Sequence, residues 1–138
     1  MPDALTVGTE CPPFVDEPLT VTDFVRYQGA SGDFNPIHFD TAFAQRAGQP
    51  GPFAVGMRQA GVLAAYAVGW LGHGNLRRYQ VQFREQAWPG DVLTYTAVIA
   101  ATQQINGRSV VDVELTCTRA GGGVHLRGWA TFDLEPTP

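Results

Sequence analysis

The sequence contains no lysine, so every permanently cationic side chain among its 138 residues is one of nine arginines. Thirteen acidic residues outnumber them and give a net charge of −4, while charged residues make up only 16% of the chain. An acidic chain with scattered arginines argues against broad electrostatic binding of nucleic acid or an anionic membrane. Its length is typical of one globular domain with a real core. We therefore predict a single domain over residues 1–138.

Cysteine is also scarce. Cys11 and Cys117 are far apart and fit neither a metal-ligand spacing nor a disulfide framework. We expect two free thiols in a reducing compartment. The first residues lack the basic stretch and apolar stretch of a signal peptide, so a cytoplasmic location is the default expectation.

Long hydrophobic runs are missing as well. The most apolar stretch, Ala60–Leu71, is about a dozen residues long, whereas a membrane-spanning helix needs roughly twenty. Arg58 and Gln59 precede it, and a glycine-rich segment follows. We predict a helix from Gly56 to Leu71 that is buried on nearly all sides.

The chain before this helix is punctuated by proline and glycine. A short strand is expected within Phe14–Val21, interrupted at Pro18. Thr22 is the predicted N-cap of a short helix that ends within Gly29–Gly32. A loop follows, and Asp40 or Thr41 is then expected to cap a second short helix, Ala42–Ala47.

After Gly74 the apolar residues recur with a period of two, which indicates strands. Asn106-Gly107 and Gly121–Gly123 are hairpin signals between the last three strands. An antiparallel meander of four long strands with one apolar face needs a cover, and the 56–71 helix is long enough to provide it. The pattern predicts an α+β hot-dog fold, a curved antiparallel sheet wrapped around one long buried helix, with the N-terminal strand completing the sheet.

The chemistry-bearing residues lie in the segment Gly-Asp-Phe-Asn-Pro-Ile-His. Asp33 and His38 are five residues apart on a loop that Pro36 stiffens. A carboxylate and an imidazole facing one point can move a proton at neutral pH. An Asx-type turn is the structural alternative, and it explains Asp33, Asn35 and Pro36 but leaves His38 unexplained.

This segment resembles the hydratase 2 motif of the MaoC-like family, the (R)-specific enoyl-CoA hydratases and (3R)-hydroxyacyl-thioester dehydratases. Gly56-Met57 and Pro89-Gly90-Asp91 also fit the family's order of elements. The resemblance implies reversible hydration of trans-2-enoyl thioesters of CoA or acyl-carrier protein to (3R)-hydroxyacyl thioesters. It also implies acid–base roles for Asp33 and His38.

In the simplest assignment His38 takes a proton from the attacking water and Asp33 delivers one to C2, although these roles are exchangeable. Asn35 would orient the pair or the water. The first amides of the 56–71 helix are unpaired, so we assign an oxyanion role to the Gly56 amide. The alternative is that Gly56 is only a flexible helix entry.

Val55 stands where the family commonly has histidine, and Arg58-Gln59 stand where it is generally apolar or small. These departures predict either a pocket for a different acyl group or residues that face a partner subunit. A solvated Arg58 is favoured over one that contacts a carrier phosphate.

The remaining histidines and arginines carry weaker signals. His73 is expected to be exposed and His125 to lie on the polar side of a strand, with no metal site. A solvated strand edge is favoured for Arg77, Arg78 and Arg84 over contact with carrier phosphates. No metal or redox cofactor is needed, because CoA or phosphopantetheine enters as part of the substrate.

A homodimer is expected, since one hot-dog domain leaves a sheet edge and an apolar surface uncovered. Two alternatives stay open. One is a catalytic subunit that pairs with a second hot-dog chain and acts on long-chain or sterol-derived acyl thioesters; the other is a non-catalytic acyl-thioester-binding subunit. An acyl-thioesterase is disfavoured, because thioesterases of this fold carry their carboxylate on the central helix and this helix has none. The sequence leaves acyl chain length, carrier and physiological direction open.

Overall fold

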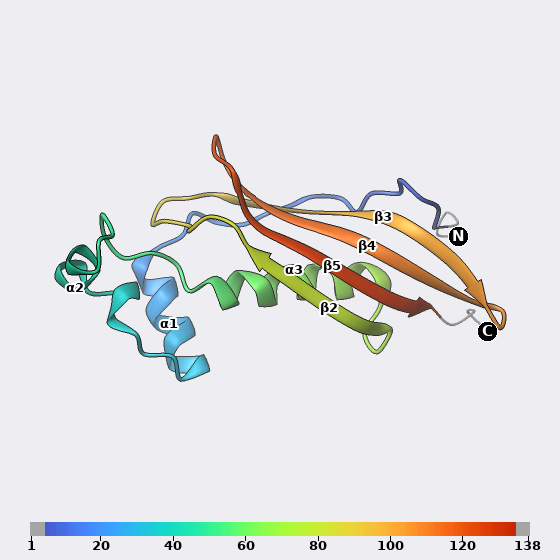
Figure 1. The fold of residues 1–138 in the computed structure, drawn as a ribbon, viewed down its shortest axis with the longest axis horizontal. Coiled ribbons are helices and arrows are strands. Elements are labelled where there is room, and N and C mark those ends of the chain that lie inside the picture. The colour runs from blue at the N-terminus through green and yellow to red at the C-terminus, as the bar shows by residue number, and fades with distance from the viewer. Residues whose placement is uncertain (1–4, 135–138) are drawn as a thin grey trace.

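The structure, a computed structural model, describes residues 5–134, which form a five-stranded antiparallel sheet and a long central helix (Figure 1). The sheet order is β1-β3-β4-β5-β2. In chain order the elements are β1 (Phe14–Val15), α1 (Val21–Ser31), the 3-10 helix η1 (Pro36–His38), α2 (Thr41–Arg46), α3 (Gly56–Leu71), β2 (Leu76–Phe83), β3 (Leu93–Ile105), β4 (Arg108–Arg119) and β5 (Val124–Leu134).

The alternation of apolar and polar residues corresponds to the two faces of the sheet. In β4 the side chains of Val111, Val113, Leu115 and Cys117 are all at most 1% exposed, and the residues between them are half-buried or exposed. The hairpin at Asn106-Gly107 has φ of 52° and 77°, the left-handed backbone that favours these two residue types. The four predicted long strands are therefore confirmed. The predicted meander order is wrong for β2, which pairs with β5 and not with β3, because the connection 84–92 carries the chain from one edge of the sheet toward its opposite side.

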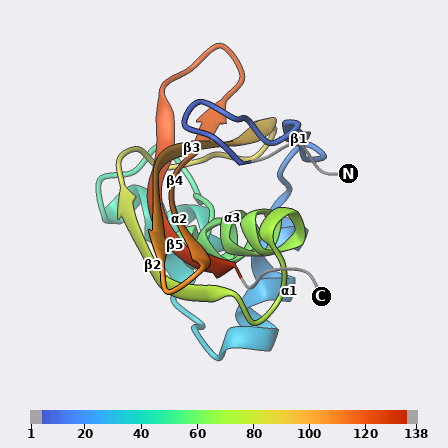
Figure 2. The same ribbon diagram turned by 90° about the vertical axis from the view of Figure 1, so that its right-hand side faces the viewer.

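The sheet curves around α3 on one side, as Figure 2 shows in end view. Leu63 and Ala67 of α3 are at most 1% exposed and pack in the core formed with the inner sheet face. This is the predicted hot-dog arrangement. The expectation that α3 is buried on nearly all sides is wrong, because the sheet covers only one side of the helix. The uncovered side is a stripe of exposed residues four apart, here called the helix stripe: Met57, Gly61, Ala65 and Gly69.

The N-terminal half differs from the prediction at two points. The strand within the 14–21 range is limited to Phe14–Val15. Helix α1 begins one residue before the predicted cap, Thr22, because Thr20 and Asp23 form a reciprocal capping box: Thr20 Oγ1 accepts from the Asp23 amide at 3.1 Å, and Asp23 Oδ2 accepts from the Thr20 amide at 2.9 Å. At its other end Gly32 adopts a left-handed backbone, φ 80°.

Asp40 caps α2, as predicted, by accepting a hydrogen bond from the Phe43 amide at 3.0 Å. Helices α1, η1 and α2 gather at one end of the molecule, next to the N-terminal end of α3 (Figure 1). The motif loop is thereby placed beside the helix start. Among the described residues no helix is both long and apolar enough to cross a membrane.

Candidate active site

The motif loop is shaped by two successive side-chain-to-backbone turns. The Asn35 amide donates to Asp33 Oδ1 at 3.2 Å, and the Ile37 amide donates to Asn35 Oδ1 at 3.1 Å, so that Asn35 caps η1. Gln28 of α1, 1% exposed, donates from Nε2 to the Asn35 carbonyl at 2.9 Å and ties the loop to the helix. The turn chemistry that explains Asp, Asn and Pro without catalysis is therefore present. Asn35 thus has a structural role in this loop. Gln28 positions the loop and was not predicted from the sequence.

His38 is held by the segment that leads into α3. Its Nδ1 lies 2.7 Å from the Phe53 carbonyl oxygen, and its ring meets the Phe53 ring edge-on at 5.0 Å. A carbonyl oxygen only accepts, so Nδ1 carries the proton in this tautomer and Nε2 presents a lone pair. The side chain is 8% exposed. A neutral imidazole fixed in this way is prepared to accept a proton at Nε2.

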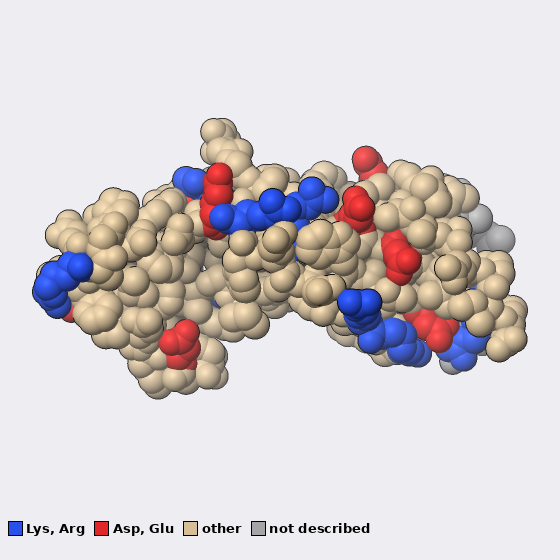
Figure 3. All heavy atoms as spheres, in the orientation of Figure 1, with Lys and Arg blue, Asp and Glu red and all other residues tan. Residues whose placement is uncertain are grey.

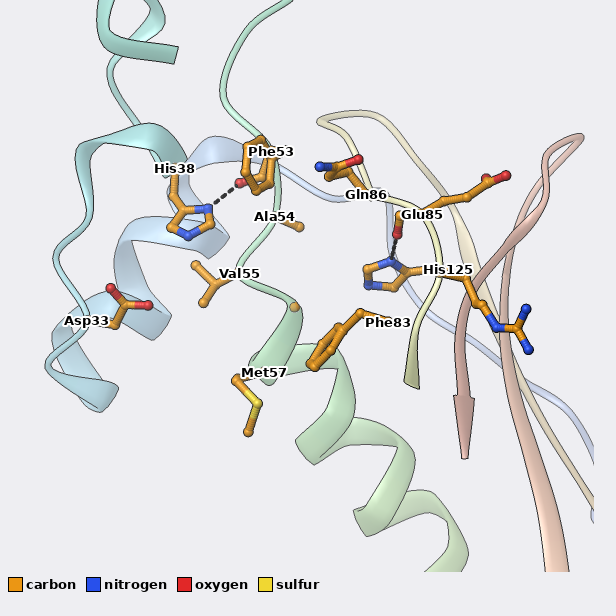
Figure 4. Close-up of a pocket in the computed structure, with 12 residues that line it drawn as sticks. Asp33, His38, Phe53, Ala54, Val55, Met57, Phe83, Glu85, Gln86 and His125 are labelled. Carbon is orange, nitrogen blue, oxygen red and sulfur yellow. Dashed lines mark hydrogen bonds between the residues drawn. The ribbon is translucent and has the colours of Figure 1, made fainter. Parts of the chain in front are cut away.

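Asp33 and His38 line the same cavity, with a volume of about 410 Å³. Figure 4 shows both side chains on one side of it, turned toward Val55 at the start of α3. The opposite wall comes from the end of β2 and from β5. The lining residues are Asp33, His38, Phe53, Ala54, Val55, Gly56, Met57, Phe83, Arg84, Glu85, Gln86 and His125.

Gly56 is the first residue of α3 and lines this cavity. The preceding residue, Val55, contributes no side-chain cap, so the first amides of the helix are left for another acceptor. A Cβ at position 56 would lie 2.6 Å from Cε1 of Phe83, closer than carbon atoms approach without a shift. Glycine thus lets Phe83 pack directly on the helix start. The site geometry is compatible with the predicted oxyanion role, which stays a prediction.

His125 is not on the polar side of its strand, as the sequence suggested, but is buried at 2% exposure. Its Nδ1 lies 2.5 Å from the Glu85 carbonyl oxygen and its Nε2 lies 3.2 Å from Nε2 of Gln59. These contacts are mutually satisfied when Nδ1–H donates to the carbonyl and Nε2 accepts from the Gln59 amide. Burial lowers the pKa of His125 below its usual range, which favours this neutral form.

A bulge in β5 explains the wrong prediction for His125. Cys117 pairs with Leu126 and the next residue, Thr118, pairs with Val124, so His125 is the extra residue on its strand. A bulge re-aims a side chain, and here two consecutive residues, His125 and Leu126, are buried. Strict alternation therefore fails at this position.

The unusual Arg58-Gln59 pair makes its contacts within the chain. Gln59 is fully buried, and its Oε1 accepts from Arg58 Nη1 at 3.3 Å. Arg58 in turn lies 3.6 Å from the Asp16 carboxylate and is only partly exposed. The favoured expectation of a solvated Arg58 is therefore wrong. Residue 55 is a valine and not a histidine, and the second imidazole that lines the cavity is that of His125 on β5.

Other predicted residues lie away from the cavity. His73 is exposed, and Cys11 and Cys117 are free thiols, both buried. Burial raises the pKa of Cys117 to about 12, so this thiol is unreactive. Arg77 lies 3.8 Å from Asp133, and Arg78 donates to Gln80 at 3.2 Å. Of the three arginines considered together, Arg84 alone lines the cavity.

Comparison with known structures gives the same architecture. An (R)-hydratase of A. caviae involved in PHA biosynthesis superimposes with a TM-score of 0.82 at 22% identity, covering 96% of this chain and 99% of that chain. One chain of the ChsH1-ChsH2 complex from Mycobacterium tuberculosis gives a TM-score of 0.81 at 18% identity, covering 94% and 98%. At these identities the likeness establishes the hot-dog fold.

The sequence comparisons identify the family. A fatty acid synthase subunit beta from Gibberella zeae is 30% identical over 119 residues, which is 84% of this chain. The chain spans only 4–6% of the length of these curated relatives. Residues 5–120 match the MaoC like domain, and this match covers most of the chain. The chain therefore belongs to the MaoC-like domain family.

Proposed function

We propose that this chain is a hydro-lyase that reversibly adds water to trans-2-enoyl thioesters and forms (3R)-hydroxyacyl thioesters. One observation carries the proposal: a carboxylate, an imidazole with a free Nε2 and a helix start with open amides all line one cavity of about 410 Å³. This combination supplies a base, an acid and an oxyanion site, which the reaction requires.

The reaction begins with the thioester carbonyl oxygen facing the Gly56 amide and a water held between C3 and His38. Nε2 of His38 takes a proton from the water as its oxygen attacks C3. The electron pair of the C2=C3 bond moves toward the thioester carbonyl, whose oxygen gains negative charge next to the helix start. In this assignment Asp33 enters the step as the carboxylic acid, delivers its proton to C2 and becomes a carboxylate. The active site is reset when His38 returns its proton to Asp33 through solvent, which the exposure of Asp33 permits.

The opposite assignment, with Asp33 as base and His38 as acid, uses the same atoms in the reverse order. Hydration and dehydration share one transition state, so the physiological direction depends on concentrations. CoA and carrier-protein thioesters present the same reacting group.

The test is turnover of short-, medium- and long-chain trans-2-enoyl-CoA by the purified chain, followed by loss of the conjugated thioester absorbance and by chiral analysis. We expect the (3R) product, with kcat at least ~10²-fold lower in His38→Ala. His73→Ala, which changes an exposed histidine, is the matched control and should behave as wild type. A (3S) product, or an active His38→Ala variant, would contradict the proposal.

We also infer that a second hot-dog chain covers the helix stripe. Met57 at its start is 58% exposed and lines the cavity, and neighbouring Phe83 is 51% exposed. Small residues at three of the four positions let another helix approach closely. Cross-linking or ultracentrifugation of the purified chain tests a homodimer. A monomer that gains turnover only with a second hot-dog chain would instead favour a heterodimeric dehydratase.

A further inference from the structure

A second cavity of about 370 Å³ adjoins the proposed reaction site. It is lined by Arg84, Glu85, Val124 and Arg127, and the first two of these residues also line the reaction cavity. Figure 3 shows a row of arginine atoms across this face of the molecule, between groups of acidic side chains. A local excess of positive charge beside the site is unexpected in a chain with a net charge of −4.

The two arginines are neighbours on the outer sheet face. Gln82 of β2 is paired with Arg127 of β5, and the Arg84 amide continues the pairing by donating to the His125 carbonyl at 2.9 Å. Arg84 follows the last residue of β2, and its side chain and that of Arg127 line the same cavity. Like charges that are close together repel each other unless an anion lies between them.

The two guanidinium groups are at most weakly paired within the described part of the chain, where Arg127 also lies 5.9 Å from the centre of the Trp129 ring. The Arg84 side chain has no hydrogen-bond or ion-pair partner there. Arg127 reaches Glu114 only at 4.0 Å, and its Nε is buried without a hydrogen-bond partner. The Glu85 carboxylate pairs with Arg119, whose Nη1 lies 3.5 Å from Glu85 Oε2. By contrast Arg119 has a close carboxylate partner, Asp91, at 2.7 Å. The cavity therefore offers unused donors to an anion.

The distance between the start of α3 and the Arg84 guanidinium matches the length of the carrier arm of a thioester. Between the thioester sulfur and its first phosphate the arm is roughly thirteen bonds long, or about 15 Å at the ~3.5 Å per three bonds of an extended chain. Phe83 packs against Gly56 and directly precedes Arg84. The Cα atom of Arg84 is one Cα–Cα step from that of Phe83, and an extended arginine side chain reaches further outward. The Arg84 guanidinium is therefore on the order of 10–15 Å from the helix start.

We propose that Arg84 and Arg127 form a phosphate-binding site for the 4′-phosphopantetheine arm of the substrate. The inference rests on the proposed function, because that function fixes the position of the thioester. The shared ligand chemistry is a phosphate ester, which belongs to CoA or to a carrier protein's prosthetic group. The thioester end enters the reaction cavity, and the phosphate end stays on the outer face between the two arginines.

The experiment compares three crotonyl thioesters that differ only in the arm: crotonyl-CoA, crotonyl-4′-phosphopantetheine and crotonyl-pantetheine, which has no phosphate. In the variant Arg84→Ala/Arg127→Ala we expect KM for the two phosphorylated substrates to rise about tenfold or more, with kcat little changed. KM for crotonyl-pantetheine should not change. Arg78→Ala, at the other end of β2, is the matched control and should leave all three unchanged. An effect on both phosphorylated substrates would support a site for the phosphate of the arm, whereas an effect on crotonyl-CoA alone would place the arginines on the nucleotide part of CoA and overturn the proposal.

Equal KM increases for all three substrates, an unchanged KM for both phosphorylated ones, or an equal effect of Arg78→Ala would overturn the proposal. Calorimetric binding of free CoA gives a readout that needs no turnover. If the wild-type chain binds CoA and the double variant binds it about tenfold more weakly, the phosphate site stands even if hydration fails. If the wild-type chain does not bind CoA and phosphopantetheine does not compete with the thioesters, the phosphate site is refuted.

Discussion

Replacing the buried Gln59–His125 pair should destabilise the protein in a non-additive way. Gln59→Leu leaves Nε2 of His125 without a donor, and an unsatisfied buried polar group costs about 1–3 kcal/mol. His125→Leu leaves both the Gln59 amide and the Glu85 carbonyl unpaired, for a cost of about 2–4 kcal/mol. In the double variant the Glu85 carbonyl and Arg58 Nη1 have each lost a partner, but neither Gln59 nor His125 is left as an unpaired buried group, so the loss should be smaller than the sum by at least ~1 kcal/mol.

The assay is urea unfolding followed by circular dichroism at neutral pH, with His73→Leu as the control because His73 is exposed. Losses that add within ~0.5 kcal/mol would show that Gln59 and His125 are not coupled, and the bridge between α3 and β5 would then be refuted.

The same pair predicts how stability varies with pH. The folded pKa of His125 is lowered from its ordinary value of 6.5 by burial, so the unfolded chain binds more protons as the pH falls. The stabilisation from neutral His125 is present above pH 6.5 and is lost as the pH falls toward the folded pKa, at up to ~1.4 kcal/mol per pH unit. His125→Leu should remove this slope relative to wild type and to His73→Leu. An unchanged slope would contradict the assignment.

Three further predictions concern the framework of the site. Gly56→Ala places a methyl group 2.6 Å from the Phe83 ring, so kcat should fall about tenfold or more, and adding Phe83→Ala should recover part of it in a turnover assay. Asn35→Ala removes the cap of η1 and should cost about 0.5–2 kcal/mol in urea unfolding, whereas Asn35→Asp keeps the acceptor and most of the stability; equal losses would contradict this reason. Thr20→Ala should cost about 1 kcal/mol and lower the thermal midpoint by several degrees, while Thr22→Ala has little effect; the reverse order would show that the helix begins where the sequence suggested.

Much of the fold follows from local patterns. The apolar alternation in the second half and the Asn106-Gly107 turn define four strands, because each signal is local and strong. The pairing of β2 with β5 in place of β3 has no local signal. The single long apolar segment then has only one sheet face to cover. The position of the α1 start was less predictable, since Thr20 and Thr22 are both acceptable caps and only the reciprocal contact with Asp23 distinguishes them.

The site was predictable where one short segment carries it. Asp33, Asn35 and His38 are close in sequence, and Gly56 marks a helix start. Gln28, Gln59 and His125 were not assigned because their partners are distant in sequence, 7, 66 and 40 residues away for the hydrogen bonds that hold them. The burial of His125 also depends on a bulge that breaks the strand pattern. Tertiary contacts of this kind have no single-sequence signature.

The central claim is that Asp33 and His38 act as one acid–base unit, and a double-mutant cycle on kcat/KM for a trans-2-enoyl-CoA tests it most directly. Asp33→Asn and His38→Gln keep the size and polarity of the side chains. Each should lower kcat/KM by about 10²–10⁴-fold, and the double variant should be no slower than the slower single variant within about threefold. Losses that multiply in the double variant, or a single variant with wild-type kcat/KM, would contradict the account.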